Sequence, residues 1–373
     1  MNRDDVEKLL THSLPEPLVW SGYVSVPADP AELRGLPAHV GGMFAAAATA
    51  LGEGGEPREL PLSDQETVLA AVGAHAQDWM GHSVAIFICG KLGLFETVKL
   101  PCEVAERTVL ATRPYVRPLL AALRRCPSYG VAVVDRRYAR IFRIAGETIA
   151  PVANLEGEAP RGHRFGGWYG LESHRINERV LQLARRHYHQ TAAALEKFLG
   201  RDGCEVFVAG GHTHEVAQFL GVLSHPLRRR FAGSFVADPH TATPARVRDL
   251  ADAAIARWED AEDRRLADGA KGDPAAVTGL EACVHAANQH AVGLLIVPDD
   301  EEITAGFTCA ECGALALSGG ACSACGAERS AVVDIVEELV VKVLHEGGRV
   351  EPVRDAARLG GVAARLRFPL PPD

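Results

Sequence analysis

The sequence predicts an α/β protein made of consecutive domains, and three observations support this prediction. Apolar segments of strand length alternate with longer amphipathic segments, as in folds whose strands and helices alternate along the chain. The chain has 373 residues, enough for two or three domains. Its hydrophobic content of 47% is ample for buried cores. Breaks in the pattern divide the chain into three α/β domains at residues 1–125, 128–267 and 275–370.

The first domain combines predicted strands with a helix. Gly22–Pro27 is typical of a strand. A helix is expected near Asp64–Met80, because its apolar residues recur on one face. Val84–Cys89 and Leu94–Leu100 are rich in strand-forming residues and are separated by the turn-like sequence Gly-Lys-Leu-Gly. These two segments therefore predict a hairpin.

The second domain alternates strands with long helices. Strands are predicted at Gly130–Asp135, Tyr138–Ile144 and Glu205–Ala209, and helices at about Leu171–Leu199 and Pro244–Leu266. The first of these helices carries an apolar stripe at helical spacing that should face the core. The stripe consists of Ile176, Val180, Leu183, His187, Thr191, Leu195 and Phe198.

The third domain follows Asp268–Pro274, whose glycines, proline and charges predict a linker. Beyond it the pattern predicts a helix, a strand, a cysteine-rich module, a second helix and two strands. In order, these segments are Gly279–Asn288, Gly293–Val297, Phe307–Ala327, Val332–Glu346, Arg349–Pro352 and Gly361–Phe368.

Four cysteines in this module are typical of a structural zinc site. Cys309 and Cys312 form one Cys-x-x-Cys pair, Cys322 and Cys325 form another, and a glycine follows each pair. A tetrahedral Zn²⁺ ion takes four thiolates from two tight turns, and glycine allows the sharp turn. Disulfides or a redox pair are the alternatives, but neither explains two matched pairs in a chain without an export signal. The sequence therefore predicts a zinc ribbon at residues 307–327.

The chain is expected to be cytoplasmic and not bound to a membrane. Its N-terminal segment lacks the apolar region of a signal peptide. No run of about 18 apolar residues is present, so no membrane span is predicted. The five other cysteines lie among apolar residues and are expected to be buried thiols in a reducing compartment: Cys89, Cys102, Cys126, Cys204 and Cys283.

The net charge of −9 does not favour nucleic-acid binding, but residues 161–189 are locally basic. Within them, Gly166 and Gly167 allow close approach of the backbone to a partner, and two aromatic residues that can stack on bases follow. The alternative is an ordinary surface hairpin with a solvated arginine face. The candidate RNA-binding residues are Arg161, His163, Arg164, Trp168, Tyr169, Arg175, Arg179 and Arg186.

Three stretches, in this order, resemble the archaeal and eukaryotic class-1 peptide-release factor and Pelota superfamily. The resemblance is to its bacterial branch, with the Balon-like ribosome-binding factors. Tyr129–Phe142 is similar to the opening strands of the family's central domain, and Gly166-Gly167-Trp168 stands where the family carries a Gly-Gly-Gln loop. The third stretch comprises Gly279–Leu280, Ala291–Val297, the four cysteines and Leu359–Phe368.

The resemblance implies a central domain of RNase-H-like topology. It also implies a C-terminal domain like the kink-turn RNA-binding ribosomal proteins, with the zinc ribbon inserted. It further implies docking in the ribosomal A site, so that ribosomal RNA and peptidyl-tRNA are the expected partners. Relatives act with elongation-factor-type GTPases, which makes such a GTPase an expected partner as well.

Two departures from the family's pattern bear on activity. The family's glutamine is Trp168 here, and an indole donates one hydrogen bond and accepts none. Residues 1–125 also lack an Asn-Ile-Lys-Ser-type codon-reading motif, so termination at stop codons is not expected. No catalytic residue is identified, and Gly166, Gly167 and Trp168 are the candidate loop.

Three functions are compatible with these residues. The first is a non-hydrolytic factor that occupies the A site of idle or stalled ribosomes, as a hibernation factor does. The alternative is a codon-independent peptidyl-tRNA hydrolase that frees stalled chains, with the backbone of Gly166 and Gly167 holding the water. The third is an RNA-binding stress protein that never reaches the peptidyl-transferase centre. The tryptophan favours the first.

Overall fold

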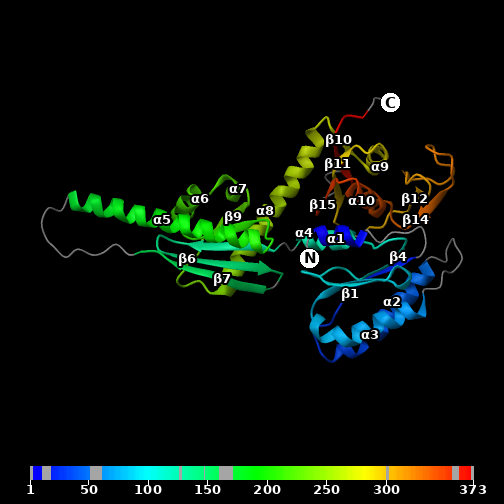
Figure 1. The fold of residues 1–373 in the computed structure, drawn as a ribbon, viewed down its shortest axis with the longest axis horizontal. Helices are drawn as coiled ribbons and strands as arrows, with labels where there is room; N and C mark the ends of the chain where they lie inside the picture. The colour runs from blue at the N-terminus through cyan, green and yellow to red at the C-terminus, as the bar shows by residue number, and fades with distance from the viewer. Residues whose placement is uncertain are drawn as a thin grey trace. The chain divides into compact units, whose positions relative to one another are not determined.

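The computed structural model divides the chain into two compact units, each a mixed α/β structure (Figure 1). Unit 1 combines Met1–Arg125 with Asp263–Asp373, and unit 2 comprises Cys126–Glu262. Unit 1 contains both terminal parts of the chain. The division of these parts into an N-terminal and a C-terminal domain therefore stays a prediction. The structure describes residues 3–10, 18–50, 61–125, 128–146, 148–158, 171–299, 302–354 and 361–370.

The N-terminal part of unit 1 is an antiparallel sheet in the order β3-β2-β1-β4. The predicted hairpin is confirmed, since β2 and β3 pair from Val84↔Lys99 to Cys89↔Leu94. The elements are α1 (Arg3–Leu10), β1 (Val19–Ser25), η1 (Glu32–Gly35), α2 (Leu36–Ala50), α3 (Leu62–Trp79), β2 (Ser83–Cys89), η3 (Gly90–Leu92), β3 (Leu94–Lys99), β4 (Arg107–Ala111) and α4 (Arg117–Arg125).

Both faces of this sheet are buried, because alternate residues of its central strands enter two different apolar clusters. Trp20 and Ile86 pack in the cluster that also contains residues of α2 and α3. Tyr23 and Phe87 lie in the other cluster, with Leu119 of α4. Every residue of β2 is buried, which explains why this strand is a continuous apolar run in the sequence.

The C-terminal part of unit 1 contains a second sheet in the order β10-β16-β11-β15, in which only β11 and β15 are parallel. A smaller three-stranded sheet, β13-β12-β14, is inserted between β11 and α10. The elements are β10 (Ala276–Thr278), α9 (Leu280–Asn288), β11 (Val292–Pro298), β12 (Gly306–Cys309), β13 (Leu315–Ala316), β14 (Arg329–Val332), α10 (Ile335–His345), β15 (Arg349–Val353) and β16 (Ala363–Leu366).

The prediction of a linker at Asp268–Pro274 is wrong for most of this segment. Helix α8 (Pro244–Gly272) continues through it. Ala267 and Ala270 are buried in a small cluster with Ile296 and other residues of the second sheet. This packing outweighs the low helix propensity of the two glycines in the segment, a tertiary effect that the local sequence does not reveal.

One apolar cluster joins the two parts of unit 1. It contains Tyr23 and Phe87 of the first sheet, Leu119 of α4, Leu295 of β11 and Leu339 of α10. The exposed fraction of each of these side chains is 2% or less. Residues at the two ends of the chain therefore share one core, and we expect them to stabilise each other.

Polar contacts between α4 and α10 lie beside this core, and they define what we call the α4–α10 junction. The carboxyl group of Glu337 accepts hydrogen bonds from the backbone N–H groups of Val116, at 2.6 Å, and Arg117, at 3.0 Å. The N-terminal N–H groups of a helix have no partner within the helix, so Glu337 caps α4 from a distant part of the chain. The guanidinium of Arg117 pairs with Asp334 at 3.3 Å.

Unit 2 is a five-stranded sheet in the order β7-β6-β5-β8-β9, with β5, β8 and β9 parallel and the others antiparallel. Residues of α5, α6 and α7 share a cluster with one face of the sheet, and residues of α8 share another with the opposite face. The elements are β5 (Tyr129–Val134), β6 (Tyr138–Ala145), β7 (Thr148–Glu156), α5 (Leu171–Arg201), β8 (Phe207–Gly210), α6 (Thr213–Gly221), α7 (His225–Arg228) and β9 (Phe231–Phe235).

The apolar stripe predicted for α5 is buried in its C-terminal half. His187, Thr191, Leu195 and Phe198 are each 3% exposed or less. Toward the N-terminus the stripe is only half-buried, at Val180 and Leu183, and the side chain of Ile176 lies outside the described residues. In Figure 1 the N-terminal half of α5 extends past the strands of unit 2. Within the described residues, no helix has the length and apolar character needed to cross a membrane.

The buried position of Glu337 predicts a specific pH dependence of stability. Burial, reinforced by the nearby charge of Asp334, raises the pKa of Glu337 from the ordinary value of 4.5 to about 8. The folded state therefore keeps a proton that the unfolded chain loses. This stabilisation is complete below pH 4.5 and is lost as the pH rises through about 8. Within that window the free energy of unfolding should fall with rising pH by up to about 1.4 kcal/mol per unit.

We predict that Glu337→Gln flattens this dependence. Urea unfolding at pH 6 and pH 9, with hydrogen exchange of the β2 amides as the readout, measures the free energy of unfolding of unit 1 at each pH. The exposed Glu66→Gln substitution in α3 is the control and should keep the dependence of the unaltered chain. Identical pH profiles for Glu337→Gln and the unaltered chain would contradict the prediction.

Candidate metal centre and basic helix

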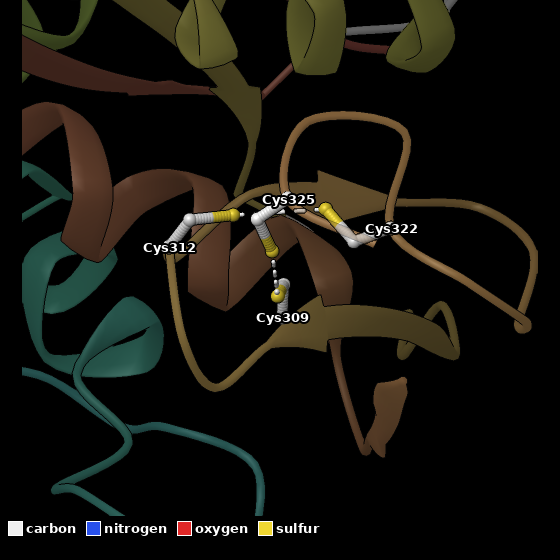
Figure 2. Close-up of side chains that lie close together, drawn as sticks. All are labelled: Cys309, Cys312, Cys322 and Cys325. Carbon is white, nitrogen blue, oxygen red and sulfur yellow. Dashed lines mark hydrogen bonds between the residues drawn. The ribbon is translucent and has the colours of Figure 1, made fainter. Parts of the chain in front are cut away.

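The four cysteines lie on the inserted sheet β13-β12-β14. Cys309 is the last residue of β12 and is opposite Arg329 of β14. Cys312 follows in the turn that leads to β13, and the other two cysteines lie in the segment between β13 and β14. Figure 2 shows the four side chains converging from the two turns.

The two Cys-x-x-Cys turns have the same backbone geometry. In each, the N–H group of the glycine that follows donates to the carbonyl of the first cysteine: Gly313 to Cys309 and Gly326 to Cys322, both at 2.8 Å. These glycines have φ angles of 67° and 80°, in the left-handed region that glycine adopts without steric cost. The glycine after each pair is therefore required by the turn.

The sulfur atoms are spaced as a tetrahedral metal ion requires. All four lie within 4.8 Å of one another, with 3.4 Å between Cys309 and Cys325 and 3.6 Å between Cys312 and Cys322. A tetrahedral zinc with Zn–S bonds of about 2.3 Å places its sulfurs about 3.8 Å apart. In the described part of the chain this is the one cluster of at least three potential ligands with such spacing. The cluster can therefore hold a metal ion.

Backbone N–H groups at the turns favour the thiolate form, which is the form that binds metals, at the first cysteine of each pair. Hydrogen bonds with the other cysteines instead raise the pKa of Cys312 and raise that of Cys325 to about 12. Hydrogen bonds from the N–H groups of Ala324 and Cys325 lower the pKa of the Cys322 thiol to about 6. The N–H group of Cys312 likewise lowers the pKa of Cys309. Each turn therefore stabilises negative charge on its first cysteine, which is also the buried one.

Contacts with α9 and α10 fix the cysteine-bearing sheet to the rest of unit 1. The side-chain amide of Asn288 donates to the carbonyl of Leu315 at 2.8 Å and accepts from the N–H of Leu315 at 2.9 Å. Leu315 itself is buried in the shared core. Lys342 donates to the carbonyl of Gly313 at 3.4 Å. Sequence reasoning missed Asn288, since a polar residue ending a predicted helix gives no signal of such a contact.

Two of the candidate RNA-binding arginines lie on the exposed face of α5. Arg179 and Arg186 are both exposed, and Arg186 forms an ion pair of 3.6 Å with Glu158. The side chain of Arg175 lies outside the described residues. The same is true of the loop residues Arg161, His163, Arg164, Gly166, Gly167, Trp168 and Tyr169. Their roles stay predictions.

Comparison with known sequences finds one family model and relatives of one kind. Residues 114–256 match the sequence model of bacterial archaeo-eukaryotic release factor family 10. Peptide chain release factor subunit 1 of Methanopyrus kandleri is 32% identical over 108 residues, 28% of this chain and 25% of the relative. Peptide chain release factor subunit 1-2 of Methanosarcina acetivorans is 29% identical over 127 residues, 32% of this chain and 30% of the relative. The chain thus aligns with a quarter to a third of each of these relatives.

Solved structures of Pelota-type proteins are also similar to this chain. Dom34 of S. cerevisiae, described as a translation termination-like factor, has a TM-score of 0.43 and 12% identity, covering 80% of this chain and 82% of its own. Pelota of Archaeoglobus fulgidus has a TM-score of 0.32 and 15% identity, covering 78% and 81%.

We predict that a chelator strong enough to strip zinc unfolds the cysteine-bearing sheet and leaves unit 2 folded. Structural zinc is coupled to local folding, and in this chain all four candidate ligands lie within residues 309–325. Hydrogen exchange before and after chelation is the measurement: protection should be lost over residues 306–332 and kept in β5 and β8. Loss of all secondary structure on chelation would contradict the prediction.

Proposed function

We propose that this chain is a translation factor that binds the ribosomal A site. Residues 114–256 match the model of bacterial archaeo-eukaryotic release factor family 10, and we infer from this match that the chain is a bacterial relative of the archaeal and eukaryotic class-1 release factors and Pelota. The observation that carries the proposal is the position of this match. It spans the Gly-Gly-Trp segment and the whole of α5, and so includes the locally basic residues 161–189, which contain six arginines against two acids.

The distribution of charge supports a nucleic-acid contact through unit 2. Residues 126–262 contain 18 Lys and Arg against 16 Asp and Glu, whereas the rest of the chain contains 21 against 32. Phosphate contacts need basic side chains, so unit 2 suits RNA and the acidic unit 1 does not. Arg179 and Arg186 project from the exposed face of α5, opposite the face buried by Leu195 and Phe198.

The role we favour is that of a hibernation or stalled-ribosome factor without hydrolytic activity. By resemblance to the family, Trp168 stands where its relatives carry glutamine. An indole ring lacks the acceptor of an amide and is much larger, so it suits stacking on a base or filling the water site. An elongation-factor-type GTPase would be a further partner, by resemblance to the family.

The finer structural assignments belong to this proposal. The strand order β7-β6-β5-β8-β9, with three parallel strands, supports an RNase-H-like unit 2. The sheet β10-β16-β11-β15 with α9 and α10 supports a C-terminal domain like the kink-turn binders, carrying the ribbon as an insertion. We assign Zn²⁺ to Cys309, Cys312, Cys322 and Cys325, where it would act structurally by joining the two turns.

A codon-independent peptidyl-tRNA hydrolase is the alternative. Gly166 and Gly167 retain the backbone freedom that hydrolytic members use to place water. This feature favours the alternative, whereas Trp168 opposes it.

Incubation with ribosomes that carry peptidyl-tRNA separates the two functions. We predict tight binding and no ester cleavage by the unaltered chain. Trp168→Gln should restore measurable release if the surrounding site is otherwise competent. Release by the unaltered chain that disappears in Gly167→Ala would instead establish the hydrolase and refute the binding-only function.

We also predict that replacing Arg179 and Arg186 by alanine weakens ribosome binding. Each lost phosphate contact should make the dependence of log affinity on log salt shallower by about 0.9. Arg201→Ala is a matched control, because Arg201 lies on the same helix, is exposed and pairs with its neighbour Asp202. If the double variant and Arg201→Ala bind with the same affinity and the same salt dependence, the exposed face of α5 does not contact RNA.

A further inference from the structure

Asp334, the N-cap residue of α10, is a meeting point for three segments of unit 1. One carboxylate oxygen accepts from the N–H of Val336, at 3.0 Å, within its own helix and from the N–H of Thr304, at 3.4 Å. The other accepts from the hydroxyl of Tyr115 at 2.8 Å. The guanidinium of Arg117 adds an ion pair at 3.3 Å. Asp334 therefore joins α10, the start of the inserted sheet and the entry to α4.

These groups are almost completely removed from water. The side chains of Arg117 and Asp334 are 3% and 1% exposed. Glu337 is 4% exposed and holds the first N–H groups of α4. A buried charge that loses its partner cannot be solvated, so small displacements at this junction raise the free energy of the folded state strongly. The junction therefore tolerates one arrangement well and intermediate ones poorly.

The same segments continue directly into the metal centre. Thr304 lies two residues before β12, and Asp334 lies two residues after β14. The two strands pair without a break from Gly306↔Val332 to Cys309↔Arg329. The N–H of Ile335 also donates to the carbonyl of Thr304 at 2.7 Å. One short ladder thus has a metal ligand, Cys309, at one end and the α4–α10 junction at the other.

We propose that metal binding by the four cysteines and closure of the α4–α10 junction are thermodynamically coupled through this ladder. The proposal rests on the proposed function only in taking the cysteines as a zinc site. Zinc holds Cys309 and the turns around it, which keeps β12 paired with β14. The paired strands hold Thr304 and Asp334 in register, and Asp334 then receives Tyr115 and Arg117. Without the metal the ladder frays and Asp334 loses its fixed position.

Gly306 shows how tightly the ladder and α10 are packed. A Cβ atom at Gly306 would lie 2.5 Å from the Cβ of Ile335, the first residue of α10. Ile335 is completely buried, so it has no room to move aside. The start of β12 and the start of α10 therefore cannot shift independently of each other, which is what transmission along the ladder requires.

Hydrogen exchange of the full chain tests the coupling. The amides of Val116 and Arg117 are remote in sequence from the cysteines but belong to the junction. We expect their exchange to accelerate by about fivefold or more when a chelator removes zinc, in the range of ordinary allosteric coupling. The amide of Val131 in unit 2 is the internal reference and should not change. If zinc is bound before chelation and absent after it, and exchange at Val116 and Arg117 is unchanged, the coupling is refuted. The assignment of the zinc site would stand.

Linkage is reciprocal, so the junction must also influence zinc affinity. Tyr115→Phe removes the hydroxyl that donates to Asp334 and accepts from Arg107 at 3.3 Å, and it preserves the ring in the core. We expect this variant to bind zinc about fivefold or more weakly in competition with a chromophoric chelator. Tyr138→Phe, which removes an exposed hydroxyl in unit 2, should match the unaltered chain. Equal zinc affinity in both variants would overturn the coupling, and absence of zinc binding by the unaltered chain would overturn the metal assignment itself.

Discussion

A buried cluster of polar groups at the N-terminus of α10 is the constraint on which unit 1 depends. It combines the ion pair of Asp334 and Arg117 with the carboxyl group of Glu337, whose raised pKa keeps it protonated at neutral pH. Asp334 and Glu337 face the entry to α4, where Arg117 and two backbone N–H groups receive them. Burying such charges is costly, and the cost is offset only when every group has a partner of good geometry. Here the N-terminus of α10 supplies part of that compensation for Asp334, because its N–H groups favour negative charge. The shared apolar core lies against this junction, so the two ends of the chain are joined by packing and by charge together.

The division between the two units has a functional interpretation. Unit 2 contains the excess of basic residues and the long helix α5, and most of it falls within the part of the chain that matches the bacterial release-factor family. Unit 1 is acidic and carries the cysteine cluster. In our proposal unit 2 contacts RNA, while unit 1 is a body whose rigidity depends on a metal. Loss of the metal would then act on unit 1 first and leave the RNA-binding face intact.

Local patterns in the sequence were sufficient for some features of the structure. The β2–β3 hairpin follows from two segments rich in strand-forming residues around a turn-like spacer, and the buried half of α5 follows from periodicity. The spacing of the four cysteines identifies the cluster that could hold a metal ion. Features that depend on distant residues could not be predicted. Helix α8 runs through the expected linker because Ala267 and Ala270 are buried by strands that come later in the chain. The contact between Glu337 and α4 joins residues more than 200 positions apart, and no local pattern indicates it.

The central claim is that this chain is a translation factor that acts on the ribosome through the Gly-Gly-Trp segment of unit 2. A cryo-EM map of the zinc-loaded chain bound to 70S ribosomes tests it most directly. Our account predicts density for the chain in the A site, with Trp168 against ribosomal or transfer RNA. A chain that fails to bind ribosomes, or that binds elsewhere with Trp168 away from RNA, would contradict the account.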